Sequence, residues 1–306
     1  MKLFYTLFFF LFTIQLSFAQ SSLEQLNNYI QEVKNGSYEP VPQSILSATE
    51  NYQSLLESLE THQNDSLALV RTRAYNISKR IGQNAEFLTL RQQAIGQQIT
   101  ALDDADADIR IKAINGLTGF KNTDFTDEQQ FNIINRFKPN RPHLEIYARL
   151  VGFLPSEEGI APLKQVLSQT TDGWERFNIQ LALARKGDTE ATNAIINKMN
   201  TAPVNDGFVY DVVPVLVYSR SEEVFKFLEK IIFSEEANCS SANPDSNAKI
   251  LCGYRVMEYL APAIVDYPLA TDKYGELLTN DYEQALTEVR GWFKANLDYE
   301  LVQDTY

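Results

Sequence analysis

The chain has 306 residues, of which 40 are acidic and 27 are basic, and its formal net charge is −13. Nucleic acids and anionic membranes are bound through clustered Lys and Arg, so this excess of acid argues against both as partners. The length exceeds the usual size of one hydrophobic core, which leaves two domains or an elongated repeat architecture.

Residues 1–19 have the three-part build of a cleavable signal peptide. Lys2 precedes an apolar run that ends at Ile14, and small residues stand at the first and third positions before a cut after Ala19. The run is too short to cross a membrane, which takes about 20 residues as a helix. We therefore expect an exported protein, periplasmic or secreted, with no integral membrane segment once the signal peptide is cleaved.

Residues 20–62 show weak helical periodicity and are expected to form an N-terminal helical cap. Residues 63–236 are a succession of helix-length apolar periodicities, without the two-residue alternation of a strand. The helices are expected in pairs whose first members recur roughly every 32 to 42 residues, as in two-helix solenoid units. The expected starts are near Asp65 and Asn84, Asp106 and Thr126, Arg141 and Glu157, Trp174 and Asp188, and Asp206 and Ser221.

Two of these helix starts have the residues of a capping box. Thr126 is followed three residues later by Gln129, and Asp172 by Glu175. In this motif the first side chain accepts a hydrogen bond from a free amide of the first turn, and the later side chain accepts one from the cap residue. Both places are therefore expected to begin helices.

The repeats also share sequence. Val70-Arg71-x-x-Ala74 and Ile109-Arg110-x-x-Ala113 align in the first helices, and a turn with Gly187-Asp188 separates a later pair. This pattern resembles the short HEAT-like repeats of the bilin-lyase type. The resemblance implies an all-α fold, a right-handed α-solenoid of about five or six helix pairs, in which stacked neighbours bury each other's apolar faces. The chain departs from the pattern near Tyr210, where Asp211 and Pro214 interrupt a first helix.

Residues 237–306 are expected to form a C-terminal helical cap, with helices starting near Asn247 and Tyr274. This segment holds the only two cysteines, Cys239 and Cys252. Because disulfides persist outside the cytoplasm, we expect a bridge between them. Closing a loop of this size contributes on the order of 3 kcal/mol in the chain-entropy model. The alternative is two unpaired thiols.

The acidic run at residues 103–108 invites a calcium interpretation, because its alternating carboxylates supply hard oxygen ligands. An EF-hand loop counted from Asp104 needs Gly at its sixth position and Glu at its twelfth. This chain has Ile109 and Asn115 there. The run is better explained as a repeat turn and a helix start, where Asp caps free amides.

His62 and His143 are the only histidines, and no motif supplies partners for a zinc site. Tyr147 and Arg149 lie on the helix expected near His143, and the three together could abstract a proton from an acidic sugar. Only His143 and Tyr147 share a helix face. Ordinary surface and packing roles explain the set better, and neither a metal nor a cofactor is expected.

Aromatic side chains are frequent, and most are expected in the core because they recur at helical spacing. Trp174 stands at a helix start between repeats, where its side chain can face the concave surface. It either packs against the next unit or anchors a protein or glycan. Trp174, Tyr210 and Tyr218 are the candidate partner-binding residues.

No nucleophile elbow, phosphate-binding loop or dinucleotide fingerprint occurs in the chain. We therefore expect a protein that is not an enzyme. The expected function is an extracytoplasmic scaffold or adaptor that binds a protein partner through a solenoid surface. The alternative is a carbohydrate-active enzyme whose helices close into an α/α toroid around an acidic and aromatic cleft, and a small ligand bound between repeats is a third possibility.

Overall fold

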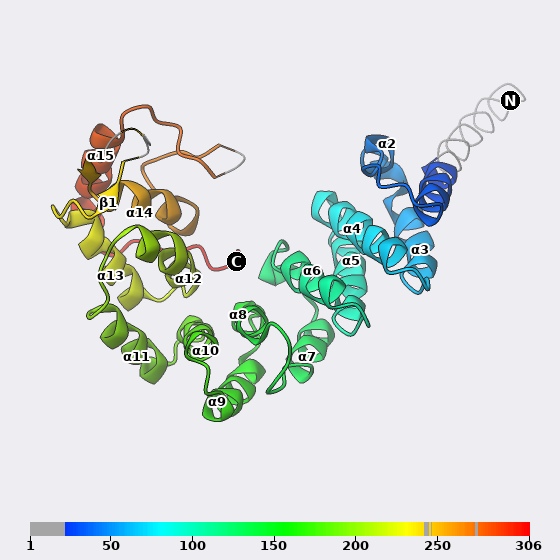
Figure 1. The fold of residues 1–306 in the computed structure, drawn as a ribbon, viewed down its shortest axis with the longest axis horizontal. Coiled ribbons are helices and arrows are strands. Elements are labelled where there is room, and N and C mark those ends of the chain that lie inside the picture. Colours follow the sequence, from blue (N-terminus) through cyan, green and yellow to red (C-terminus); the bar gives the residue numbers. More distant parts are fainter. Residues whose placement is uncertain (1–21, 242–244, 246, 273–274) are drawn as a thin grey trace, which may run out of the picture. The chain divides into compact units, whose positions relative to one another are not determined.

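The computed structural model describes residues 22–306 except 242–244, 246 and 273–274. The signal peptide expected at residues 1–19 lies outside this part. The described residues are mostly helical (Figure 1), which confirms the all-α prediction. No described helix combines the length and the apolar character that crossing a membrane requires.

The chain divides into two compact units at residues 136 and 137. In unit 1 the helices α3, α4 and α5 each pack on the next helix and also contact the helix after next. Its elements are a helix at residues 22–34, α2 (Gln43–Leu46), η1 (Thr49–Asn51), α3 (Tyr52–His62), α4 (Ala68–Asn84), α5 (Leu88–Ala101), α6 (Ala107–Leu117), η2 (Asn122–Asp124) and α7 (Asp127–Asn135).

Arginines near the start of α4, α5 and α6 hold the turns of unit 1. Arg71, Arg91 and Arg110 each donate to the main-chain oxygens five and six residues earlier, over 2.7 to 3.3 Å. Arg71 also binds both carboxylate oxygens of Asp104, at 2.7 and 2.8 Å. Arg91 binds one carboxylate oxygen of Asp124 at 2.9 Å. Each ion pair therefore joins one helix to the turn before the helix after next.

Unit 2 contains the remaining helices and one short hairpin (Figure 1). Its helices are α8 (Leu144–Phe153), η3 (Glu157–Gly159), α9 (Ile160–Gln169), α10 (Gly173–Arg185), α11 (Thr189–Met199), the π-helical η4 (Phe208–Val212), α12 (Val213–Tyr218), α13 (Glu222–Phe233), α14 (Gly253–Leu260), η5 (Ala261–Ala263) and α15 (Tyr282–Ala295). The hairpin pairs β1 (Cys239–Ser240) antiparallel to β2 (Lys249–Ile250).

The helix caps confirm several predicted starts. The capping box of Thr126 and Gln129 forms at α7. Asp106, Asp172 and Asp188 accept hydrogen bonds from first-turn amides of α6, α10 and α11. These contacts satisfy amides that have no partner within the helix.

Two predicted starts in the C-terminal segment are wrong. The helix expected near Asn247 begins at Gly253, because residues 249 and 250 form β2. The next helix begins at Tyr282, eight residues after the predicted Tyr274. The interruption expected before Pro214 is present as the π-helical turn η4, since proline has no amide to donate to the helix.

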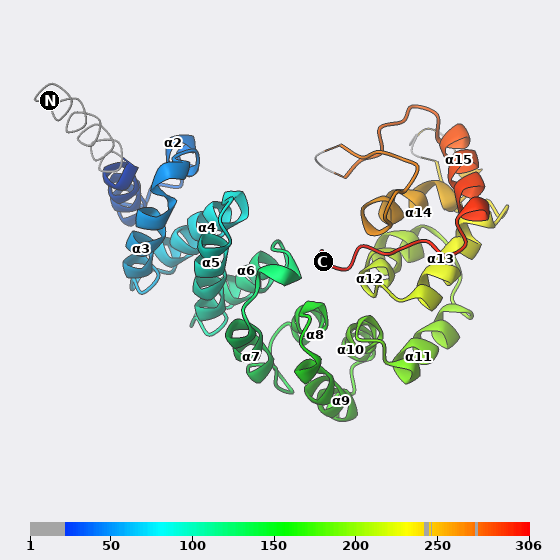
Figure 2. The same ribbon diagram turned by 180° about the vertical axis from the view of Figure 1, so that it is seen from behind.

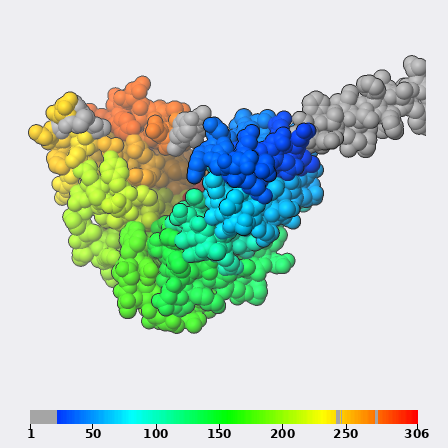
Figure 3. Space-filling view, turned by 45° about the vertical axis from the view of Figure 1, so that its right-hand side comes forward, coloured from blue at the N-terminus to red at the C-terminus, as the bar shows by residue number. Residues whose placement is uncertain are grey.

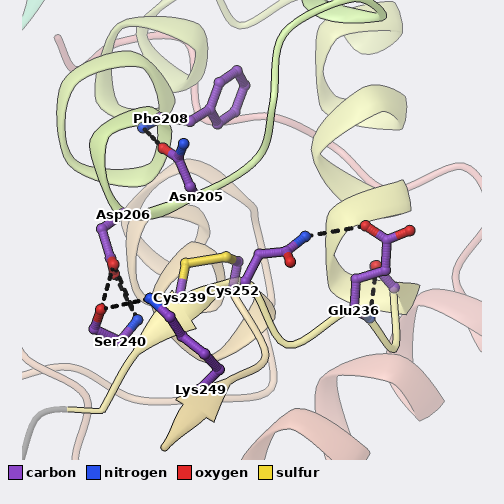
Figure 4. The surroundings of a disulfide bond; sticks show 10 residues. Asn205, Asp206, Phe208, Glu236, Cys239, Ser240, Lys249 and Cys252 are labelled. Carbon is purple, nitrogen blue, oxygen red and sulfur yellow. Dashed lines mark hydrogen bonds between the residues drawn. A yellow bond between two sulfur atoms is a disulfide. The ribbon is translucent and has the colours of Figure 1, made fainter. Parts of the chain in front are cut away.

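The predicted disulfide between Cys239 and Cys252 is present, with both residues buried (Figure 4). It closes the base of the β1–β2 hairpin. Asp206 accepts hydrogen bonds from the amide and the hydroxyl of Ser240, and Lys249 donates to the same hydroxyl (Figure 4). The bridge and these bonds tie the hairpin to the start of the helix that leads into α12.

Candidate functional site

The C-terminal segment crosses unit 2 as an extended chain. Figure 2 shows it in red, running from the end of α15 past α13 and α12. Its middle is fixed by a bridge between Leu301 and Ile264 and by a hydrogen bond from the Val302 amide to the Ala263 oxygen, 2.9 Å. Residues 303–306 continue beyond this anchor. We call residues 299–306 the tail.

Arg185, the last residue of α10, holds the tail by its main chain. Its Nη2 donates to the oxygens of Gln303 and Thr305, at 3.0 and 2.6 Å. Its Nη1 donates to the oxygen of Tyr218 at 2.7 Å. The guanidinium also lies over the rings of Phe153 and Tyr218, at 5.1 and 4.9 Å from their centres. One side chain thus joins α10, α12 and the tail.

Arg220, just after α12, holds the preceding part of the tail. Its Nε donates to the oxygen of Val302 at 2.8 Å, and its Nη1 donates to the oxygen of Val217 at 2.5 Å. Arg220 has a φ of +46°, a backbone conformation uncommon for residues other than glycine. The chain takes this turn where α12 ends, and the side chain returns toward the tail.

The aromatic ring of Tyr306 fills a pocket made by α8 and α12. Arg149 of α8 donates from Nε to the Tyr306 hydroxyl at 2.7 Å. The ring lies 4.9 Å from Tyr218 and 5.6 Å from Phe153, centre to centre. Burial raises the pKa of the Tyr306 hydroxyl above its usual value. The pocket therefore binds a neutral phenol. We call its walls the arginine cradle: Arg149, Phe153, Arg185, Tyr218 and Arg220.

Close helix packing positions the cradle. A Cβ atom at Gly152 of α8 would lie 2.5 Å from the Tyr218 hydroxyl oxygen and 2.7 Å from Ala182 of α10. Only glycine fits this approach. The Tyr218 hydroxyl can therefore reach the main-chain oxygen of Arg149, to which it donates at 2.6 Å.

The cradle concentrates positive charge. Within the described part of the chain, no side-chain carboxylate pairs with Arg149, Arg185 or Arg220. Burial lowers the pKa of Arg185. Burial, together with repulsion from Arg185, lowers the pKa of Arg220 to about 10. Main-chain oxygens compensate Arg185 and Arg220, and the Asn178 amide oxygen and the Tyr306 hydroxyl compensate Arg149. An anionic group would compensate these cations more fully.

A groove of about 1070 Å³ opens beside the end of the tail. Thr305 and Tyr306 form part of its wall, and side chains of α12, α14 and the segment before α15 form much of the rest. In the space-filling view the orange segment after α14 covers one end of unit 2, next to the yellow hairpin (Figure 3). We call the groove of about 1070 Å³ the tyrosine groove, because Tyr218, Tyr259, Tyr282 and Tyr306 line it.

Polar side chains of the tyrosine groove are only partly paired. Tyr282 donates to Glu258 at 2.8 Å, and this contact and burial raise the pKa of the Tyr282 hydroxyl. Arg255 lies over the ring of Tyr210, 5.7 Å from its centre. The Nε of Arg255 is buried and has no hydrogen-bond partner among the described residues.

The three predicted partner-binding residues lie in different surroundings. Tyr210 is 49% exposed in η4 and joins the groove through Arg255. Tyr218 lines the groove but is buried, and its hydroxyl is already bonded. Trp174 is 44% exposed at the start of α10, packs on Phe177 and is not part of the groove. The structure thus places Tyr218 in the groove wall and Tyr210 beside Arg255 of that wall, whereas Trp174 lies outside the groove.

The set of His143, Tyr147 and Arg149 does not converge. His143 precedes α8 in a left-handed conformation. Tyr147 is fully buried and stacks on Phe137, with Arg141 over its ring. Arg149 points to Tyr306 instead. Packing accounts for Tyr147, and recognition of the tail accounts for Arg149.

The acidic run at residues 103–108 serves the turn before α6. Asp106 caps the helix, and Asp104 binds Arg71. Burial alone would raise the pKa of Asp104, but the hydrogen bonds from Arg71 and from the Asp106 amide lower it overall. Among the described residues no group of three or more His, Cys, Asp or Glu side chains is arranged to hold a metal ion.

The sequence interpretation missed Arg185 and Arg220. The three arginines of the cradle are 36 and 35 residues apart, close to the repeat period. Equal spacing would place them at equivalent positions of successive units, and this is the signal that could have found them.

Comparison with known proteins assigns no relative. No protein family matches the chain, and no curated protein matches it either. A function for the chain therefore rests on the geometry of the cradle and the groove.

Proposed function

We propose that the chain is an exported scaffold that binds a protein partner by taking up an extended segment of that partner in the tyrosine groove. The observation that carries this proposal is the tail itself. Unit 2 already holds an extended segment through main-chain oxygens, with Arg185 and Arg220 as donors. The groove continues from the end of that segment.

The helical architecture supports this proposal. In unit 1 the helices stack on neighbours and on helices after next, and similar arginine contacts recur at their turns. We propose that these are HEAT-like repeats and that the helices form a right-handed α-solenoid. Proteins of this architecture commonly use extended surfaces for binding.

The residues of the groove suit a protein ligand. Tyr and Arg are enriched among the residues that contribute most to protein interfaces, because they combine a large apolar surface with a polar end. Tyr259 and Tyr282 supply this surface from α14 and α15. Arg255 supplies a cationic side chain in the groove wall. The volume is large enough for several side chains of an extended segment.

The disulfide supports export. Disulfides form and persist in oxidising compartments and are rare in the cytosol. The bridge between Cys239 and Cys252 is buried and closes a structural hairpin. We propose that residues 1–19 direct the chain out of the cytoplasm and are then removed.

Site-specific photo-crosslinking in the cells that produce the chain tests the proposal. A photoreactive amino acid replaces Tyr282 at the rim of the groove, or Lys226 on the exposed surface of α13 as the control. The proposal predicts one crosslinked protein from the position of Tyr282 and none from that of Lys226. Finding the chain uncrosslinked at both positions contradicts it.

The crosslinked partner, once purified, allows a quantitative test. Tyr282→Ala removes a groove side chain, whereas Tyr38→Ala removes an equally large exposed side chain from unit 1. Loss of an interface hot spot costs more than about 1.4 kcal/mol, or tenfold in affinity. We expect at least that loss for Tyr282→Ala and an unchanged affinity for Tyr38→Ala. Equal affinities in both variants place the interface elsewhere.

A further inference from the structure

Residues 303–306 contact the arginine cradle largely through groups that any peptide has. Arg185 donates hydrogen bonds to two main-chain oxygens of this segment. The side chain of Tyr306 contacts the cradle through its ring and its hydroxyl. Recognition of the main chain does not depend on sequence, and one pocket for a side chain supplies the selectivity.

The anchor of the tail lies upstream of the cradle. The bridge at Leu301 and the amide bond of Val302 hold the first part of the tail to residues 263 and 264. Residues 303–306 follow this anchor in the chain, and the three arginines donate to them there. This segment can therefore leave the cradle without unfolding the anchor.

The tail leaves the charge of the cradle without a paired carboxylate. Residues 298–306 include Asp298, Glu300 and Asp304 and no basic residue. No described side-chain carboxylate, including those of the tail, pairs with Arg149, Arg185 or Arg220. An acidic group of a partner segment placed against these arginines would lower the free energy of burying them.

We propose that the arginine cradle is a peptide-binding site for an extended, acidic segment of a partner protein that carries an aromatic side chain, and that residues 303–306 occupy it as a displaceable self-ligand. This inference rests on the proposed function and names the chemistry of the partner. A partner segment lying in the tyrosine groove meets the cradle at Tyr218 and Arg220, which line the groove beside Thr305 and Tyr306. Its aromatic side chain then takes the place of Tyr306.

The test uses a fluorescent peptide with the sequence of residues 298–306 and the full chain as receptor. In the wild-type chain the self-ligand competes, so the apparent affinity falls with the fraction of empty cradle. Tyr306→Ala empties the aromatic pocket. We expect this variant to bind the peptide at least tenfold tighter than the wild-type chain. Equal binding, or no binding by a folded variant, overturns the proposal.

Two matched controls define the site. In the Tyr306→Ala background, Arg185→Met removes the donors to the tail, whereas Arg176→Met removes an arginine of the same helix that binds oxygens of Leu167 and Thr170. We expect at least a tenfold loss for Arg185→Met and no loss for Arg176→Met. A peptide with alanine in place of its own tyrosine at 306 should also bind at least tenfold more weakly. Equal binding of the two peptides rules out the aromatic pocket.

A second measurement does not depend on the folding of a variant. Fluorotyrosine at position 306 of the wild-type chain reports whether that ring is packed against Tyr218 and Phe153. Added unlabelled peptide at millimolar concentration should replace the resonance of the packed ring by that of a fully solvent-exposed one. An unchanged resonance shows a fixed tail and overturns the proposal. A wild-type dimer that the peptide dissociates assigns the cradle to a second copy, which also overturns it.

Different results would contradict the proposed function of the groove and the proposed self-ligand of the cradle. Crosslinking from Tyr282 reports occupation of the groove whether or not the tail moves. A crosslinked partner together with an immobile Tyr306 leaves the groove as the interface and removes the self-ligand. Peptide binding to the cradle without any crosslinked partner keeps the peptide site and contradicts the scaffold function.

Discussion

Replacing Arg185 by methionine should release the tail from unit 2. Methionine keeps an apolar stem against Phe153 and removes three hydrogen bonds, two of them to the tail. A hydrogen bond to a charged group contributes about 1.5–3 kcal/mol. The cost of burying the cation, which lowers the pKa of Arg185, offsets part of this. We therefore expect tail docking to weaken by about 3 kcal/mol, or about 100-fold.

Hydrogen exchange measures this change. The amide of Val302 donates to the Ala263 oxygen at 2.9 Å and belongs to the anchor, whereas Arg185 holds Gln303 and Thr305 beyond it. Release of residues 303–306 is a local opening, since the anchor and the rest of unit 2 can stay folded. In Arg185→Met the protection of residues 303–306 should fall by up to about 100-fold, whereas that of the Val302 amide should be unchanged.

The control is Arg176→Met, which lies on the same helix and makes two hydrogen bonds to main-chain oxygens but does not touch the tail. Its tail protection should equal that of the wild-type chain. Protection that stays within twofold of wild type in Arg185→Met refutes the role given to this arginine. So does an equal loss of protection in both variants.

Three further outcomes are expected in denaturant unfolding. Gly152→Ala should lower the free energy of unfolding by about 1–3 kcal/mol, because the added Cβ would clash with Tyr218 and α10. Gly291→Ala places its Cβ where no atom lies within 4 Å and should raise the free energy of unfolding by about 0.5–1 kcal/mol. A change of the same sign in both variants contradicts the packing argument. Asp104→Asn should lower the free energy of unfolding by about 2 kcal/mol. In the wild-type chain this contribution should be lost in acid, as the pH falls through the lowered pKa of Asp104. Asp103→Asn, which changes a 54% exposed carboxylate, should lower the free energy of unfolding by less than about 1 kcal/mol. Burial, together with the charge of Arg185, lowers the pKa of Lys186 from 10.5 to about 8. Between these two pH values the unfolded chain binds a proton that the folded chain has lost, so the free energy of unfolding should rise with pH. Lys186→Met should remove that rise. If the free energy of unfolding of Lys186→Met rises with pH as steeply as that of the wild-type chain between pH about 7.5 and about 9.5, the lowered pKa is contradicted.

The features that sequence reasoning predicted well depend on neighbours in the chain. A cap such as Asp106 or Thr126 bonds to amides two or three residues away, so its residue type and position are enough to predict it. The disulfide followed from the compartment and from there being only two cysteines. The long apolar periodicities likewise indicated helices where helices are found.

The same local signals failed around the hairpin. Asp, Asn and Ser begin turns as readily as helices, because their side chains bind nearby amides in both. Asn247 therefore indicated a helix start where the chain enters β2. Two-residue strands are too short to show an alternation of apolar and polar residues.

The cradle was out of reach for a different reason. Arg149 and Tyr306 are 157 residues apart, and Arg185 and Thr305 are 120 apart. The tail has no helical periodicity and no motif that marks it as a ligand of the preceding helices. Only the fold shows that its main-chain oxygens meet Arg185 and Arg220 and that the Tyr306 hydroxyl meets Arg149.

Hydrogen-exchange mapping of the chain with its purified partner tests the central claim most directly. A partner segment in the tyrosine groove should protect α14 and residues 275–282, and should deprotect the tail at residues 303–306. The exposed side of α11 should be unchanged. Protection confined to α11 or to unit 1, with the groove and the tail unaffected, would contradict the claim that unit 2 binds its partner as an extended segment.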